Sequence, residues 1–530
     1  MMMRRRAWLA ATAAALPLLP AAGRAQVTTL DMRPGAMPVK PDDSIAAGYR
    51  RSVLIRWGDR VIFDAPDWNP LQPTPQGAAA QFGWDARICA LVQSPPAADG
   101  VARAVLAVAH PTVDPAMAFP DGRDRPAVAA AMQGASLLNL ERQGGRWIVV
   151  DGGYQSRRLT AETLCRISGP AADTVGSTVQ GLLGITGGCA TPWGTLLLGE
   201  DDPAPWLTRL RNLDARFSDG LRFGWVAELD PLDPQSIPAK RTAPGRFPRG
   251  DLAAALAPDG RAVVYMTDRR AFGYLFRFVS TGPANAPDAL DAGTLAVARL
   301  EGAGLTWTPL PEGAGTALNA VTAASQVAAT PFDLPSGLAI DPRSGRLYMA
   351  CRGNAARRPE QVDALNPRAG SSGGHIVEIV PEGGDHAGGR ASASLLLLGG
   401  HPPARFGLPP GAWPDAPSTL TVDQRGRLWI GTDHAGWVGA APDTLWGCDT
   451  QGPGRGFPLP LYGAPRGAAI GGAALSPDGQ ALFAVARTPG AEPGASFVNP
   501  GTRWPQFDPA LPPRSTLMSV ARQDGGAVGG

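Results

Sequence analysis

Short apolar runs separated by Gly, Pro and Asp turns make up most of the chain. Four stretches share one pattern, in which an apolar strand end, a polar turn containing glycine and a second apolar run follow one another. These stretches are LAPDGRAVVYM (256–266), AIDPRSGRLYMA (339–350), VDQRGRLWIGT (422–432) and LSPDGQALFAVA (475–486). The glycine supplies the positive φ that a tight hairpin turn needs. The pattern therefore predicts recurrent β-hairpins.

Recurrent hairpins of this kind are typical of β-propeller blades, which have about 40–50 residues each. We predict an all-β fold, a single β-propeller of about six blades with long inserted loops, over residues 53–522. Residues 26–52 are expected to form an N-terminal extension and 523–530 a flexible tail. The gaps from Gly260 to Gly345 and on to Gly426 exceed one blade length, so we expect each to hold two blades. Loops from distant positions meet at the channel of a propeller, which is where we expect a site.

Composition narrows the class of protein. The chain has 67 glycines and 54 prolines, too many helix breakers for a mostly helical protein. A hydrophobic fraction of 44% is sufficient for a large core. The 48 basic residues balance 46 acidic ones, and no basic run follows the N-terminus, so we expect no nucleic-acid partner.

The N-terminus has the features of an export signal. Arg4–Arg6 precede an apolar run over 7–22, and the small residues Gly23 and Ala25 stand where a peptidase would cleave before Gln26. The paired arginines favour the twin-arginine route over ordinary secretion for a signal peptide of residues 1–25. No other apolar run reaches about 18 residues, so we expect no membrane span and a periplasmic or secreted bacterial protein.

Common catalytic motifs are absent from the sequence. It contains no H-E-x-x-H and no P-loop, which leaves zincin and nucleotide-triphosphate functions without support. The five cysteines are widely spaced, and their odd number leaves at least one thiol outside any disulfide.

A series of short motifs, in order along the chain, resembles the PhoX-type alkaline phosphatases. The motifs are LIRWGD (54–59), QFGW (81–84), ISGPAA (167–172), TPWGT (191–195), GWVAELDPLDP (224–234), KRTAPGRF (240–247), YMTD (265–268), NPR (366–368), GGHIVEI (373–379), GGDHA (383–387) and APRG (464–467). The resemblance implies an exported six-bladed propeller that hydrolyses phosphomonoesters with iron and calcium ions. It also implies a small phosphate ester as the partner, and we expect a monomer.

The resemblance places candidate site residues at several of these motifs. As metal ligands it implies His110, Cys189, Glu200, Asp201, Glu228, Asp251 and Asp268. As catalytic residues that would hold the phosphate it implies Arg157 and Arg158.

Other positions differ from the pattern that the family has at its metal site. Ser336 and Thr186 stand where the family has Glu and Cys, and Arg249 falls in a segment where the family has His-Glu-Gly. Several oxygen ligands are needed to hold each hard cation, so these losses predict an impaired, altered or absent metal centre. Arg269 replaces the second Asp of a pair, and we expect its charge to neutralise carboxylates left at that place.

Three functions remain open from the sequence. The first is a PhoX-like phosphatase with reduced or rearranged metal. The second is a non-catalytic propeller that binds a ligand or partner at the mouth of its channel. The third is another propeller hydrolase, such as a lactonase with a single Ca²⁺.

Overall fold

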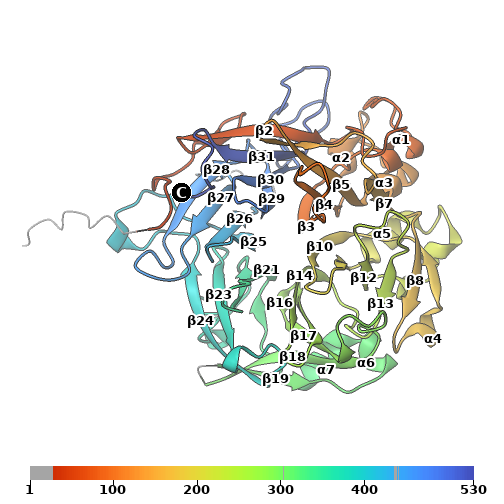
Figure 1. Cartoon of the computed structure of the whole chain (residues 1–530), viewed down its shortest axis with the longest axis vertical. Coiled ribbons are helices and arrows are strands. Elements are labelled where there is room, and N and C mark those ends of the chain that lie inside the picture. The colour runs from red at the N-terminus through yellow and green to blue at the C-terminus, as the bar shows by residue number, and fades with distance from the viewer. Residues whose placement is uncertain (1–27, 303, 435–438, 440) are drawn as a thin grey trace, which may run out of the picture.

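A computed structural model describes residues 28–302, 304–434, 439 and 441–530, and the signal peptide predicted for 1–25 lies outside them. Across these residues the sheets form six blades around one axis (Figure 1). The prediction of an all-β propeller is confirmed.

The inner strands of the blades pack side by side into a closed ring around the axis. In ring order they are β3 (Arg87–Gln93), β10 (Ile185–Ala190), β14 (Arg249–Leu256), β21 (Pro335–Ile340), β25 (Pro417–Val422) and β29 (Ala469–Leu475). All six lie around the open centre of the molecule in Figure 1.

The first two blades have separate sheets. Blade 1 adds β4 (Arg103–His110), β5 (Gly134–Gln143) and β6 (Arg146–Val149) to β3, with β7 (Arg157–Leu159) paired to β5. Blade 2 adds β11 (Leu196–Glu200), β12 (Val226–Leu229), β13 (Ala239–Arg241), β8 (Leu164–Ser168) and β9 (Thr178–Gln180) to β10.

Blades 3 and 4 join into one nine-stranded sheet. Blade 3 runs outward from β14 through β15 (Arg261–Asp268), β17 (Leu275–Pro283) and β18 (Gly293–Glu301). Blade 4 runs outward from β21 through β22 (Leu347–Cys351), β23 (His375–Pro381) and β24 (Arg390–Leu398). The two are joined by β19 (Gly304–Pro309), while β16 (Ala271–Gly273) and β20 (Phe332–Asp333) form a small separate sheet.

The last two blades include the N-terminal strands. Blade 5 adds β26 (Leu428–Thr432), β27 (Thr444–Cys448), β28 (Pro458–Gly463) and β1 (Ser44–Ile45) to β25. Blade 6 adds β30 (Ala481–Arg487), β31 (Thr516–Arg522) and β2 (Tyr49–Arg56) to β29. Because β2 pairs antiparallel with β31, the two ends of the chain close the ring together (Figure 1).

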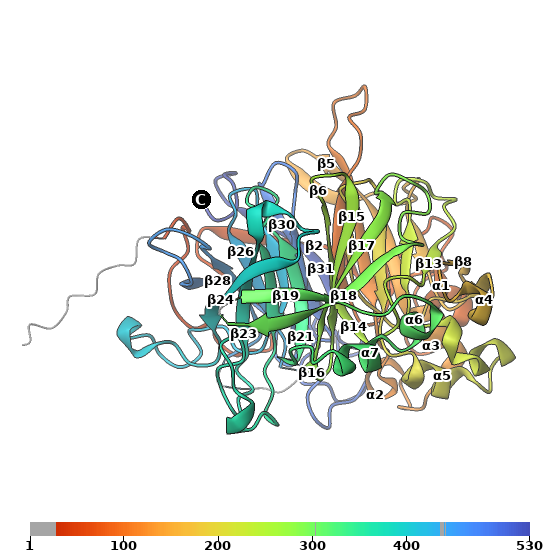
Figure 2. The same ribbon diagram turned by 90° about the horizontal axis from the view of Figure 1, so that it is seen from below.

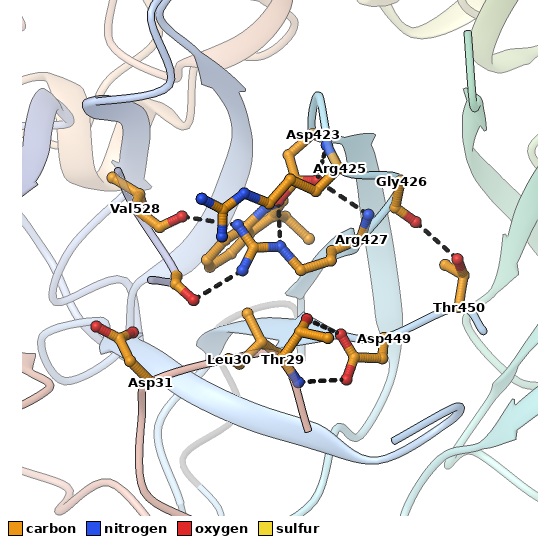
Figure 3. Close-up of polar contacts among 12 residues, drawn as sticks. Thr29, Leu30, Asp31, Asp423, Arg425, Gly426, Arg427, Asp449, Thr450 and Val528 are labelled. Carbon is orange, nitrogen blue, oxygen red and sulfur yellow. Dashed lines mark hydrogen bonds and ion pairs between the residues drawn. The ribbon is translucent and has the colours of Figure 1, made fainter. Parts of the chain in front are cut away.

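Both termini of the described chain are also tied to blade 5 (Figure 3). Arg427 pairs with Asp423 and donates hydrogen bonds to the carbonyls of Val528 and Gly529 at 2.9 and 2.7 Å. The Asp449 carboxylate accepts hydrogen bonds from the main-chain N–H and the hydroxyl of Thr29. These contacts link sequence ends that are about 500 positions apart in a chain of 530 residues.

Apolar layers fill the spaces between neighbouring blades. Leu198 packs in the layer between blades 1 and 2, whereas its neighbour Leu197 packs in the layer between blades 2 and 3. Val263 and Val264 likewise lie in two different layers. Successive side chains of a strand point to opposite faces, so strands buried on both faces produce the uninterrupted apolar runs of the sequence.

The loops divide the disc into two faces. One carries the first hairpin turn of each blade and is called here the hairpin face. The other carries the loops that enter the inner strands and leave the second strands, and is called the insertion face. Figure 2 shows α2, α3, α5 and α7 toward the insertion face and the β5–β6 turn toward the hairpin face.

Short helices occupy the insertions. Those described are α1 (Pro75–Ala80), α2 (Pro115–Ala118), α3 (Pro126–Met132), α4 (Ala172–Val175), α5 (Ala204–Leu210), α6 (Ala314–Leu318) and α7 (Ala320–Gln326). The first three begin with proline, and Thr74 and Asp114 cap α1 and α2 by accepting a hydrogen bond from a main-chain N–H. In the described part of the chain, none of the helices has the length and apolarity needed to cross a bilayer.

The predicted hairpins are confirmed, but their assignment to blades was partly wrong. Gly260, Gly345, Gly426 and Gly479 all have positive φ, between 68° and 83°. They lie in the first turns of blades 3, 4, 5 and 6, so each gap contains one blade boundary and not two blades. Insertions such as β19, α6 and α7 account for the extra length.

Candidate functional site

The insertion face of the channel carries a set of carboxylates, and each one described below is paired with a basic side chain. Glu200 ends β11 and is fully buried beside the fully buried Lys240. One Glu200 oxygen accepts from the Lys240 ammonium at 2.8 Å and from the Leu183 N–H, and the other accepts from the N–H groups of Gly224 and Trp225. The carboxylate is therefore satisfied by groups of the protein itself.

Two further carboxylates near the same blade boundary are paired with consecutive arginines. Arg269 donates to Asp201, which follows β11. Arg270 binds both oxygens of the buried Asp268 at 2.7 and 2.6 Å, a bidentate arrangement. Burial nevertheless raises the pKa of Asp268 above its ordinary value.

Arg487 joins three blades at the insertion face. It ends β30 and binds both oxygens of the fully buried Asp85, at 2.9 and 2.8 Å, just before β3. Its third contact is with Asp433 after β26, at 2.9 Å. Arg352, just after β22, lies 3.5 Å from the same Asp433 carboxylate. The ion pairs therefore continue from blade 6 to blades 1, 5 and 4.

The other predicted ligands make internal contacts. Glu228 on β12 accepts hydrogen bonds from Arg241, Trp193 and Thr195. His110 is completely buried, with Nδ1 2.5 Å from the Asp85 carbonyl and Nε2 2.7 Å from the Ser136 hydroxyl. Burial holds its pKa well below the ordinary range, so the imidazole is neutral.

The two arginines predicted to hold phosphate bind main-chain carbonyls. Arg157 donates to Pro234 and Ser236 at 2.7 and 2.9 Å. Arg158 donates to Ala131, Met132 and Gln133 and to the Ser136 hydroxyl; these acceptors tie the end of α3 to β7.

Cys189 and Asp251 lie deeper, along the wall of the channel. Cys189 is a free thiol on β10, and burial raises its pKa above the ordinary value. Asp251 on β14 accepts hydrogen bonds from the N–H groups of Gly188, Leu252 and Leu338. Burial raises the pKa of Asp251 to about 6, although the nearby Arg87 opposes this.

A cleft of about 530 Å³ opens at the insertion face over blades 4 and 5, and we call it the rim cleft. Its lining includes Arg352, Asp433, His434 and Trp413. His434 lies between Asp443, 2.6 Å from Nδ1, and Asp415, 3.4 Å from Nε2. Burial lowers its pKa, but the hydrogen bonds with both aspartates outweigh this and raise the pKa to about 10, so the imidazole is protonated at neutral pH.

The predicted ligands are not gathered into one cluster. Within the described residues, no group of three or more His, Cys, Asp or Glu side chains could hold a metal ion. Among the positions where the resemblance expects ligands, Arg249 is fully buried and donates to the carbonyls of Gly224 and Gly245. The Thr186 hydroxyl donates to the Arg249 carbonyl at 2.6 Å.

Sequence reasoning overlooked Asp85, Arg87 and Arg487. Asp85 and Arg487 adjoin strands of different blades, and Arg87 is the first residue of an inner strand. The place of each residue in its blade could have identified them. Side chains that start an inner strand or end a second strand meet near the axis of a propeller.

Comparison with known proteins gives a family match and a structural match. Residues 32–490 match the family described as alkaline phosphatase PhoX. The structure of Pseudomonas fluorescens PhoX in complex with vanadate, a transition state analogue, superimposes with a TM-score of 0.85 at 30% sequence identity. That alignment covers 95% of this chain and all of the other.

More distant matches have low scores. A gluconolactonase from Xanthomonas campestris, XC5397, has 12% identity and a TM-score of 0.34 over 92% of this chain and 98% of its own. A family AA12 carbohydrate-active enzyme of Trichoderma reesei has 12% identity and a TM-score of 0.33 over 92% and 99%. A search of curated proteins gives no match.

Proposed function

The chain belongs to the PhoX alkaline phosphatase family, and from this premise we propose that it is an exported member that binds phosphate esters at its insertion face without the family's calcium and iron chemistry. Members of this family are exported, metal-dependent phosphatases. We therefore propose that this chain binds the phosphate esters typical of the family but lacks the family's metal centre.

The observation that carries the proposal is the pairing of the carboxylates at the insertion face. Calcium and ferric iron require several oxygen ligands that remain available to the metal. Glu200 is saturated by Lys240 and three main-chain N–H groups, and Asp268 is bound at both oxygens by Arg270. A metal there would have to displace fixed cations, so the residues present do not fit a calcium–iron centre.

The rim cleft supports the binding part of the proposal. Arg352 and the protonated His434 are cations that line it, and arginine is well suited to phosphate oxygens. The neighbouring Trp413 and Trp446 offer apolar area for the rest of an ester. The volume of about 530 Å³ is in the usual range for small-molecule pockets.

Metal content and turnover test the proposal together. The mature protein is purified from the exported fraction, its iron and calcium are measured by mass spectrometry, and p-nitrophenyl phosphate hydrolysis is assayed. We expect no stoichiometric metal and no turnover, together with calorimetric binding of vanadate that weakens in Arg352→Met. The exposed Arg405→Met is the matched control and should bind vanadate as the wild type does.

A metal-dependent phosphatase with a rearranged site is the second candidate. The close superposition on the vanadate complex favours it, as does the raised pKa of Asp251, whose proton a metal could replace. Stoichiometric iron or calcium with turnover that chelators abolish would establish this candidate and overturn the first. Absence of vanadate binding in the wild type would also remove the binding function.

A further inference from the structure

The centre of the propeller holds a second cavity, separate from the rim cleft, which we call the channel cavity. Its volume is about 580 Å³, and residues of all six inner strands line it. It extends from Arg87 and Asp251 to Gln424 and Ser476, which lie at turns of the hairpin face. It shares no lining residue with the rim cleft.

Aliphatic side chains line the middle of the channel cavity. Leu91, Leu252, Ile340 and Val422 contribute from four different blades. At the inner end this lining gives way to a charged pair, because Arg87 reaches from β3 past β10 toward Asp251 on β14. Polar residues such as Gln424 and Ser476 line the end at the hairpin face.

Arg87 is a buried cation whose hydrogen bonding is incomplete. Only 5% of the residue is exposed, and no group in the described part of the chain accepts a hydrogen bond from its Nη2. Its nearest carboxylate oxygen, on Asp251, is 3.8 Å away, beyond hydrogen-bond distance. Both Asp251 oxygens are already taken by main-chain N–H groups. A buried guanidinium nitrogen without an acceptor is costly, so the geometry at Nη2 favours an acceptor from outside the chain.

We propose that the channel cavity binds a small amphiphilic anion, with its oxyanion head on Arg87 and its short apolar tail along the aliphatic wall. The guanidinium donates to the head in the geometry that suits carboxylate or phosphate oxygens. The open end at the hairpin face admits the ligand from the side opposite the rim cleft. The site is independent of the proposed phosphate-ester site and could exist whether or not the protein hydrolyses esters.

Calorimetry with hexanesulfonate at pH 7.5 tests the proposal, because this probe combines an ionised oxyanion head with a short apolar tail. We expect its binding to be about ten- to hundredfold weaker in Arg87→Met than in the wild type. The exposed Arg405→Met, which lines neither cavity, is the matched control and should leave this binding unchanged.

A second variant covers the case in which Arg87→Met does not fold. Ala473→Phe fills the cavity from blade 6 and should abolish hexanesulfonate binding while thermal melting shows an intact fold. Hexanoate and hexyl phosphate, compared at pH 8, identify the preferred head. No binding to the wild type would mean that water alone satisfies the Arg87 guanidinium, and this would overturn the proposal. So would equal binding by wild type and a folded Arg87→Met.

Discussion

Arg269, just beyond β15, donates a hydrogen bond to the carboxylate of Asp201, just beyond β11 in the neighbouring blade. The sequence predicts that an arginine at this position neutralises a neighbouring carboxylate, and the structure shows this pairing with Asp201. A guanidinium supplies positive charge and directional donors, but unlike a metal it offers no open coordination position to a substrate.

The Arg269–Asp201 pair predicts that calcium affinity can be gained by one substitution. Arg269→Asp removes the cation from Asp201 and adds a third carboxylate beside Asp201 and Asp268. Because hard cations bind clustered oxygen ligands, we expect calcium to raise the melting temperature of this variant and not that of the wild type. The measurement is thermal melting with and without millimolar calcium.

The control for that experiment is Arg299→Asp, on the outer strand β18, which changes the net charge equally. Its melting temperature should not respond to calcium. An equal response in both variants would show that the effect comes from net charge, and that the carboxylates near Asp201 form no calcium site.

Replacing Arg487 should greatly lower the stability of the fold, although no apolar core residue is changed. Its side chain binds both oxygens of the fully buried Asp85 and also pairs with Asp433, so Arg487→Met leaves the Asp85 carboxylate without its cation. We expect a loss of about 3–5 kcal/mol in the free energy of unfolding, the usual cost of breaking a buried pair. Arg142→Met breaks the surface pair with Asp478 and should cost at most about 1 kcal/mol.

Denaturant unfolding followed by tryptophan fluorescence compares the two variants. Similar losses would contradict the assignment of Arg487 as a link between blades 6, 1 and 5. The double variant Arg487→Met with Asp85→Asn should recover part of the loss, because it removes the charge that Arg487→Met leaves without a cation.

The fold was predictable because each blade contains the same local signal. Each turn glycine, and each strand that is buried on both faces, can be recognised from a few consecutive residues of the sequence. Blade boundaries were not predictable from spacing, since β19, α6 and α7 lengthen the gap between Gly260 and Gly345 without adding a blade.

The site was predictable residue by residue but not as a set of contacts. Glu200, Asp201 and Asp268 were identified from motifs, whereas their cations come from other parts of the chain, as with Lys240 and Glu200 on different strands. Arg487 and Asp85 are 402 positions apart and meet only because the ring closes. No short sequence pattern predicts a contact between residues this far apart. Only the position of each residue within its blade indicates that the two can meet.

Glu200 and Lys240 predict strong coupling in a double-mutant cycle. Lys240→Met leaves a fully buried carboxylate without its cation and should destabilise the protein by about 3–5 kcal/mol. Glu200→Gln with Lys240→Met removes both charges and should be less destabilised than Lys240→Met alone. The cycle is measured by thermal melting at pH 7.5.

A coupling near zero would mean that Glu200 does not depend on Lys240 for its charge balance. It would then remain available as a ligand, which would strengthen the metal-dependent candidate. The pair Arg103 and Glu141, half exposed on blade 1, serves as a reference with an expected coupling below about 1 kcal/mol.

Asp251 predicts how stability changes with pH. Its pKa in the folded protein is about 6, above the ordinary 3.8, so the folded state keeps the proton longer than the unfolded chain does. Stability from this group is therefore greatest at low pH and falls as the pH rises from about 4 to above 6, by about 3 kcal/mol.

Asp251→Asn cannot titrate, so the stability of the wild type relative to this variant should fall over the same range. Thermal melting between pH 4 and 8 measures it. A flat difference for Asp251→Asn would mean that Asp251 stays ionised beside Arg87 at all these pH values.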